Sequence, residues 1–222
     1  MQKRMFNKQC GLEQAVIEGW KDMTRRIEKS LSQLPTETGE YETITVQWCL
    51  EYFLVRKYYK GAILEEYHIT PELSVGEVVA VAQSYKDAGY EPGRNIPLKE
   101  HGDLQVRADS LAGWTNKMFV RADLMPYKFE ITDVKLQRLQ DISDEDCLRE
   151  GIKVVYPYID RNPNDKLKSY RFMDKKSKWG YYQLSPVRDC FAVLIDKVSG
   201  KGTWERNPWV LAYEFKLCKE EF

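Results

Sequence analysis

The segment 19–26 combines an amine, a hydroxyl and two guanidinium groups within six positions. Lys21 is protonated at neutral pH, and it could act as a base only if burial or nearby cations lowered its pKa. Arg25 and Arg26 supply such cations, and the Thr24 hydroxyl is a nucleophile that a neutral lysine would activate. The alternative is a solvated strand face or a phosphate-facing patch, and composition alone favours that alternative.

A carboxylate far along the chain is placed where a helix does not favour it. Residues 143–150 are predicted to form a helix that begins at Ser143, a good cap, and Glu150 is its last residue. The helix dipole disfavours a negative charge at that end. Glu150 therefore either forms an ion pair or has a functional role, or it is an ordinary surface residue. The sequence leaves both interpretations open.

A loop around residue 114 offers groups that recognise a base. The Trp114 ring could stack on a base while the Asn116 amide reads its edge, and the Lys117 ammonium beside them is a further substrate-binding candidate. The alternative is that Trp114 and Phe119 anchor the loop in the core.

Composition excludes several classes of function. The 222 residues carry 34 Lys and Arg against 34 Asp and Glu, so the basic excess of a protein that grips extended DNA is missing. The five cysteines are scattered, and two histidines do not complete a zinc-ligand pattern. We therefore expect no metal or other cofactor. No apolar run suits a signal peptide or a membrane span, and we expect a cytoplasmic protein with reduced thiols and no membrane partner.

The predicted elements are mostly strands. Helices are predicted where apolar residues recur at three- and four-residue spacing, and strands where they alternate or form short runs. The helices are expected at 11–19, 143–150 and 186–200. The strands are expected at 23–27, 43–68 (a hairpin turning at Tyr59-Lys60-Gly61), 78–82, 127–139 and 209–216. One slip in the alternation of 127–139 predicts a β-bulge.

Strands do not alternate regularly with helices, which disfavours a doubly wound parallel sheet. We expect an α+β fold: a small, mostly antiparallel barrel or curled sheet with helices packed on it.

The chain resembles the ASCH family, whose members have a PUA-like β-barrel. Gly19-x-Lys21-x-x-Thr24-x-Arg26 is similar to the family's GxKxxTxR signature. Further similarity lies in Gly76-Glu77-Val78-Val79, in 127–150 and in Tyr213-Glu214-Phe215-Lys216. Longer phage and bacterial ASCH proteins share patterns like Trp114-x-Asn116-Lys117-Met118-Phe119. The resemblance implies one PUA-like domain over 1–222, with insertions at 28–73 and 153–184.

One ASCH branch consists of amidohydrolases that remove the acetyl group from acetylcytidine. By this resemblance Thr24 would be the nucleophile, Lys21 its base and Glu150 the carboxylate that orients the lysine, while Arg26 would hold the oxyanion or the ribose. In a regular strand Lys21 and Thr24 would point to opposite faces, so they converge only if residues 19–23 form a turn.

Three functional hypotheses follow from the sequence. The first is a protein that binds a modified nucleoside or RNA base and hydrolyses an amide on it. The second is a non-catalytic RNA- or nucleotide-binding module in which Lys21, Arg25 and Arg26 hold phosphates and Trp114 or Trp20 stacks a base. The third is a prophage-encoded protein whose insertions bind a protein partner.

Overall fold

The computed structural model describes residues 1–35, 39–40, 42–97, 105–155, 169–177 and 180–218. Its centre is a five-stranded sheet in the order β1-β6-β9-β13-β2. Only the β1–β6 pair is parallel, and the other three pairs are antiparallel. The strands are β1 (Gln2–Arg4), β6 (Val78–Val81), β9 (Lys128–Arg138), β13 (Trp209–Cys218) and β2 (Met23–Ile27).

The predicted closed barrel of PUA-like type is wrong. Within the described ranges the strands form open sheets, and the central sheet ends at β1 and β2, which do not pair with each other. The long strands β9 and β13 have 11 and 10 residues, whereas β1 and β2 have only 3 and 5. Such short edges offer few backbone groups for closure, and β3–β5 pair among themselves instead of extending the sheet.

The β-bulge predicted within 127–139 is confirmed in β9. In the β13–β9 pairing, Glu214 lies opposite Asp133 while the next residue, Phe215, lies opposite Ile131. Thr132 is therefore the extra residue of β9. The bulge returns Ile131 and Val134 to the buried face, which explains the slip in the apolar alternation.

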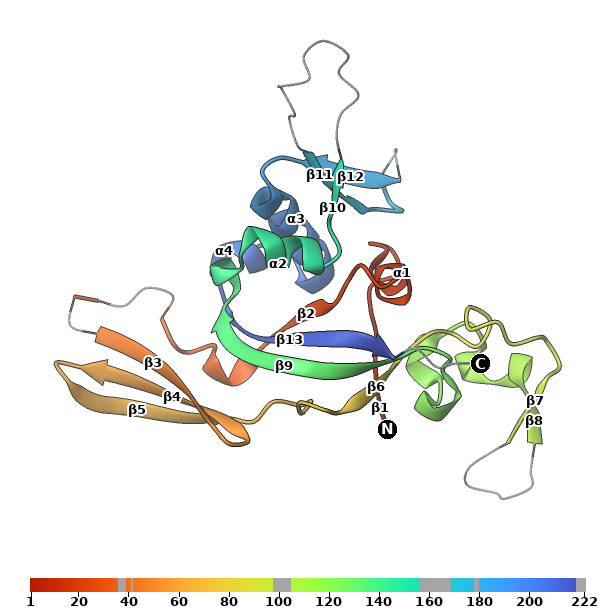
Figure 1. Cartoon of the computed structure of the whole chain (residues 1–222), viewed down its shortest axis with the longest axis horizontal. Coiled ribbons are helices and arrows are strands. Elements are labelled where there is room, and N and C mark those ends of the chain that lie inside the picture. Colours follow the sequence, from red (N-terminus) through yellow and green to blue (C-terminus); the bar gives the residue numbers. More distant parts are fainter. Residues whose placement is uncertain (36–38, 41, 98–104, 156–168, 178–179, 219–222) are drawn as a thin grey trace, which may run out of the picture.

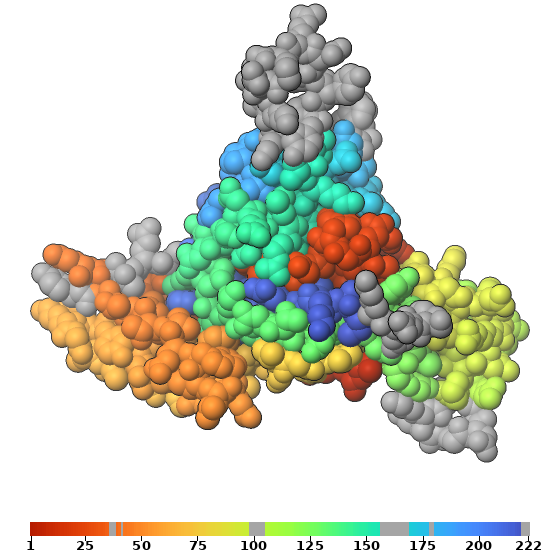
Figure 2. Space-filling model, in the orientation of Figure 1, coloured from red at the N-terminus to blue at the C-terminus, as the bar shows by residue number. Residues whose placement is uncertain are grey.

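Segment 28–73 contains a separate antiparallel sheet. Its strands are β3 (Glu42–Cys49), β4 (Tyr52–Tyr59) and β5 (Ala62–Ile69), and a short 3-10 turn, Lys29–Leu31, precedes them. The predicted turn at Tyr59-Lys60-Gly61 joins β4 to β5, with Lys60 and Gly61 at positive φ. Figure 2 shows this sheet, in orange, projecting to one side of the molecule.

The four α-helices of the described residues lie on one side of the central sheet in Figure 1. They are α1 (Leu12–Ile17), α2 (Asp144–Arg149), α3 (Val187–Ser199) and α4 (Thr203–Arg206). The helix α3 also packs against a sheet of β10 (Lys153–Val155), β11 (Ser169–Met173) and β12 (Tyr181–Leu184). This sheet forms the described part of segment 153–184. That the segments 28–73 and 153–184 are insertions remains a prediction.

Two hydrophobic clusters support the fold. The larger one joins the central sheet to α1 and α3 and includes Phe129, Phe191 and Tyr213. The smaller one, around Tyr85, lies in the stretch that follows β6. This stretch holds β7 (Asn95–Pro97), β8 (Gln105–Arg107) and four 3-10 turns: Ala108–Ser110, Ala112–Trp114, Lys117–Phe119 and Ala122–Leu124. A last 3-10 turn, Leu139–Asp141, links β9 to α2.

Candidate functional site

A turn between α1 and β2 brings Lys21 and Thr24 to one cavity. The helix α1 ends at Ile17, and Gly19, just beyond its C-cap Glu18, has a φ of +76°, the left-handed conformation that stops helices. The N–H groups of Trp20 and Lys21 both donate to the carbonyl of Ala15, at 3.1 and 3.0 Å. The strand β2 begins only at Met23, so strict alternation does not apply to Lys21, and its side chain and that of Thr24 line the same cavity.

Lys21 is buried, with only 2% of its surface exposed, and its ammonium is fully hydrogen-bonded. Its Nζ donates to the Met23 carbonyl at 2.5 Å, to the Glu150 carbonyl at 2.9 Å and to Glu150 Oε2 at 2.7 Å. A lysine ammonium has three donors, and all three are used. In this arrangement Lys21 is an anchored cation.

Glu150 joins Lys21 to Arg25. Its Oε1 accepts from Arg25 Nη1 at 2.9 Å while Oε2 accepts from Lys21. Arg25 also donates through Nη2 to Asp146 Oδ2 at 2.9 Å. Asp146 and Glu150 are four residues apart and thus lie one above the other on α2. The interpretation of Glu150 as an ion-pair partner is confirmed, and its role in catalysis stays a prediction.

The four groups Lys21, Arg25, Glu150 and Asp146, hereafter the buried ion cluster, carry equal numbers of both signs. Balanced charges joined by hydrogen bonds are what burial of ions demands, although among the described residues the buried Arg25 Nε has no hydrogen-bond partner. Burial lowers the pKa of Lys21 from its ordinary value, and the nearby arginines lower it further. Glu150 opposes this shift because it favours the charged amine. The pKa of Lys21 is therefore shifted in the direction that a lysine base requires.

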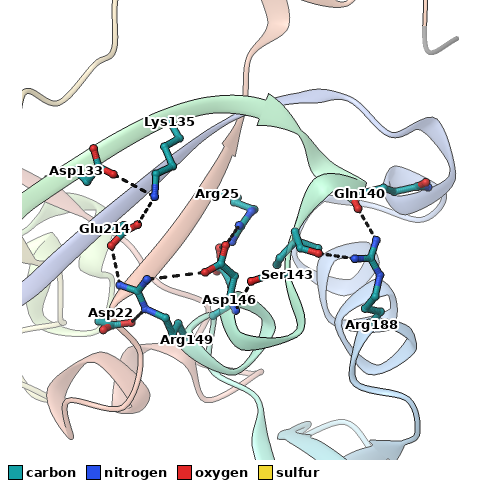
Figure 3. A network of polar contacts seen from close by, with 12 residues as sticks. Asp22, Arg25, Asp133, Lys135, Gln140, Ser143, Asp146, Arg149, Arg188 and Glu214 are labelled. Atoms are coloured by element: carbon teal, nitrogen blue, oxygen red, sulfur yellow. Dashed lines mark hydrogen bonds and ion pairs between the residues drawn. The ribbon is translucent and has the colours of Figure 1, made fainter. Parts of the chain in front are cut away.

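Helix α2 places Glu150, and polar contacts fix α2 on the sheet. Its N-cap is Ser143, whose hydroxyl accepts from the Asp146 N–H at 3.0 Å, as predicted. Figure 3 shows Arg149, next to Glu150, directed at the sheet strands. It donates to Asp22 Oδ1 at 2.8 Å and to Glu214 Oε2 at 3.0 Å. These contacts hold the end of α2 against the start of β2 and against β13.

The cavity has a volume of about 300 Å³. Its polar lining is mainly cationic, and its apolar wall comes from the N-terminal segment, α1 and α3. The lining residues are Met5, Phe6, Asn7, Leu12, Lys21, Thr24, Arg25, Arg26, Lys117, Glu150, Phe191, Leu194, Ile195 and Val198. A hollow of this kind suits a small ligand with a flat apolar part and a polar or anionic part.

Thr24 contributes its hydroxyl from the second position of β2, opposite Tyr213 of β13. It is 7% exposed. Among the described residues, no hydrogen bond joins its hydroxyl to Lys21. The amine, the hydroxyl and the Glu150 carboxylate thus share one cavity, but only Lys21 and Glu150 are in hydrogen-bond contact.

Arg26 is the cation of the cavity with the most freedom to bind a ligand. Its Nη2 donates to the Met5 carbonyl at 3.2 Å, and within the described ranges it forms no ion pair. Burial lowers its pKa, with Arg4 adding to the effect, but a guanidinium stays charged at neutral pH. An unpaired arginine in a partly closed cavity is well suited to hold an oxyanion or a phosphate.

Only part of the loop around residue 114 lies at the cavity. Lys117 lines the cavity, where its Nζ contacts Glu13 Oε2 at 2.6 Å and the carbonyl of Phe6. Trp114 packs against the smaller hydrophobic cluster, and the Asn116 side chain accepts from the Met118 N–H at 3.0 Å. Neither of these two residues lines the cavity.

Sequence reasoning missed parts of the site. Asp146 was not predicted, although its spacing of four residues from Glu150 was a usable signal. The contribution of Phe6 and Asn7 had no such signal, because it depends on how the N-terminal segment crosses the cavity. The helix expected at 186–200 gave no signal that Phe191, Leu194 and Val198 form a cavity wall.

The described residues offer no metal-binding group and no membrane-spanning helix. No group of three His, Cys, Asp or Glu side chains there could hold a metal ion. The helices of the same residues are too short or too polar to span a membrane.

Comparisons with known proteins gave no match to the chain, whether with family models, with curated proteins or with solved structures. The functional argument therefore depends on the geometry of the cavity and on the sequence motif within it.

Proposed function

We propose that the cavity binds a modified nucleoside or RNA base and hydrolyses an amide on it, such as the acetyl group of acetylcytidine. The observation that carries this proposal is the placement of Lys21, with a lowered pKa, beside Glu150 in a cavity that Thr24 also lines. The similarity of 19–26 to the ASCH signature gives further support. The volume of about 300 Å³ lies at the lower end of ligand sites, as a nucleoside requires.

The proposed reaction begins with attack of the Thr24 hydroxyl on the acetyl carbonyl. Neutral Lys21 takes the hydroxyl proton, a bond forms between Thr24 and the carbonyl carbon, and negative charge develops on the carbonyl oxygen. The C–N bond then breaks, and the departing cytosine amine receives the proton from Lys21. Water hydrolyses the acyl-threonine, which releases acetate and restores the hydroxyl.

The neighbouring residues determine whether these steps can occur. Lys21 must turn its lone pair toward Thr24 and thereby give up one of its three hydrogen bonds. Glu150 keeps the amine oriented through Oε2 while this happens. Arg26, which is free of ion pairs in the described part of the chain, would stabilise the oxyanion.

A second candidate function is binding without chemistry. It is favoured by the three filled donors of Lys21, all of which go to groups other than Thr24. In that case the buried ion cluster is structural, and Arg26 and Lys117 bind the ligand.

Turnover and binding separate the two candidates. The protein is incubated with acetylcytidine, and the release of cytidine is followed by chromatography. The amidohydrolase proposal expects cytidine release that Thr24→Val, which keeps the shape of the side chain, reduces by at least about a hundredfold. Calorimetry should show that Thr24→Val still binds acetylcytidine, whereas Arg26→Ala binds it less tightly.

Two results would decide against hydrolysis. If wild type binds acetylcytidine without releasing cytidine, the cavity is a binding site only. If neither acetylcytidine nor short RNA binds, the nucleoside proposal fails as a whole.

A further inference from the structure

A second hollow is lined in part by the turn that positions Lys21. It has a volume of about 260 Å³ and is formed by Trp20 of that turn together with β10, β11 and β12. Its lining residues are Trp20, Lys153, Arg171, Phe172, Met173, Gly180 and Tyr181. None of them lines the first cavity, so the inference below does not rest on the proposed function.

The hollow contains two pairs of a cation and an aromatic ring. Lys153 Nζ lies 4.0 Å from the centre of the Trp20 ring, and the Arg171 guanidinium lies 5.2 Å from the centre of the Tyr181 ring. Tyr181 is 39% exposed, and both cations are exposed as well. Large aromatic surface and cationic groups are therefore accessible in the same place.

The local charge is positive although the chain as a whole is neutral. Within the described ranges neither Lys153 nor Arg171 forms an ion pair, and the turn after β11 carries exposed Lys175 and Lys176 beside Asp174, which pairs with Lys197 at 2.9 Å. One nearby carboxylate, Glu18, accepts from Trp20 Nε1 at 2.7 Å and so fixes the edge of the indole. The indole is thus oriented rather than free to rotate.

We propose that this hollow binds single-stranded nucleic acid, with bases stacked on Trp20 and on Tyr181 and phosphates held by Lys153 and Arg171. Aromatic faces beside a cationic groove are how proteins bind single strands without reading sequence. A base of a duplex is stacked inside the helix and cannot reach such rings. A protein partner would not need paired cations and rings, and its binding would not depend on stacking.

The test is fluorescence anisotropy with a dye-labelled single-stranded RNA of eight nucleotides at low salt. Trp20→Ala and Tyr181→Ala are each expected to weaken binding by about 5- to 100-fold, the usual effect of losing one stacked base. Trp20→Phe should recover much of the affinity because it keeps an aromatic face. Lys153→Ala should weaken binding and lower the salt dependence by about one phosphate contact.

A matched control is available on β4. Lys60 Nζ lies 5.4 Å from the centre of the exposed Tyr59 ring, but this pair lies outside the hollow. Tyr59→Ala should bind the RNA as wild type does. Three results would overturn the proposal: no binding by wild type, an affinity of Trp20→Ala and Tyr181→Ala equal to that of wild type, or a duplex of the same sequence that binds as tightly as the single strand.

Discussion

Replacement of Glu150 by glutamine should destabilise the fold by about 3–5 kcal/mol at pH 7. The side chains of Lys21 and Arg25 are each 1% exposed, and both donate to the Glu150 carboxylate. Glutamine keeps the shape but leaves the two cations facing a neutral amide, and breaking a buried ion pair on one side costs about 3–5 kcal/mol.

A second estimate of the loss of unfolding free energy in Glu150→Gln gives a similar upper limit. Lys21 can release its proton in the Glu150→Gln variant instead of remaining an unpaired cation. Bringing an ordinary lysine with a pKa near 10.4 to the neutral form at pH 7 costs about 4–5 kcal/mol. Arg25 contributes less because it retains Asp146 at 2.9 Å.

The assay is urea denaturation at pH 7, with Glu130→Gln as the control. Glu130 pairs with Lys216 at 3.2 Å, and that lysine is 68% exposed, so its loss should cost at most about 1 kcal/mol. If Glu150→Gln is no more destabilising than Glu130→Gln, the buried ion cluster does not hold the fold as described.

The stability of wild type and the stability of Glu150→Gln should depend differently on pH. Because the folded pKa of Lys21 is lowered, the unfolded chain binds more protons between the folded and the ordinary pKa of lysine. This contribution to stability therefore rises as pH increases through that range. Without Glu150 the lysine pKa falls further, so the deficit of Glu150→Gln should shrink as pH approaches about 10. A deficit that does not change with pH would contradict this.

Three further predictions concern the scaffold. Gly113→Ala should lower stability by about 1–3 kcal/mol in thermal melts, because its Cβ would lie 2.6 Å from the Tyr85 ring; an unchanged melting temperature refutes this close packing. Ser143→Ala should cost about 1 kcal/mol through loss of the α2 cap, measured by urea denaturation. Burial raises the pKa of Cys147 and of Cys190 to about 12, so a thiol reagent at pH 8 should modify them only after unfolding, and rapid modification of the native protein would contradict it.

Local features of this fold could be predicted from the sequence. The left-handed Gly19 just beyond α1, the Ser143 cap and the bulge in β9 each follow from a few neighbouring residues. Such features depend on backbone sterics and on hydrogen bonds over one or two turns. They need no knowledge of what packs on them.

The closure of the sheet could not be predicted in this way. Whether β1 pairs with β2 depends on the length of both edges and on where β3–β5 lie, and these are long-range properties. The same limit applies to the site. The spacing of Lys21, Thr24 and Arg26 indicated a cluster of polar residues. Only the fold shows that Glu150 pairs with both Lys21 and Arg25 and that Trp114 packs outside the cavity.

The most direct test of the central claim is to trap the acyl group on the protein. Wild type is mixed with acetylcytidine and quenched in acid within the first turnovers, and its peptides are analysed by mass spectrometry. The account predicts one acetyl group on the peptide containing Thr24, formed together with cytidine, and none in Thr24→Val. Cytidine release without acetylation at Thr24, or an acetyl group on Lys21 instead, would contradict it.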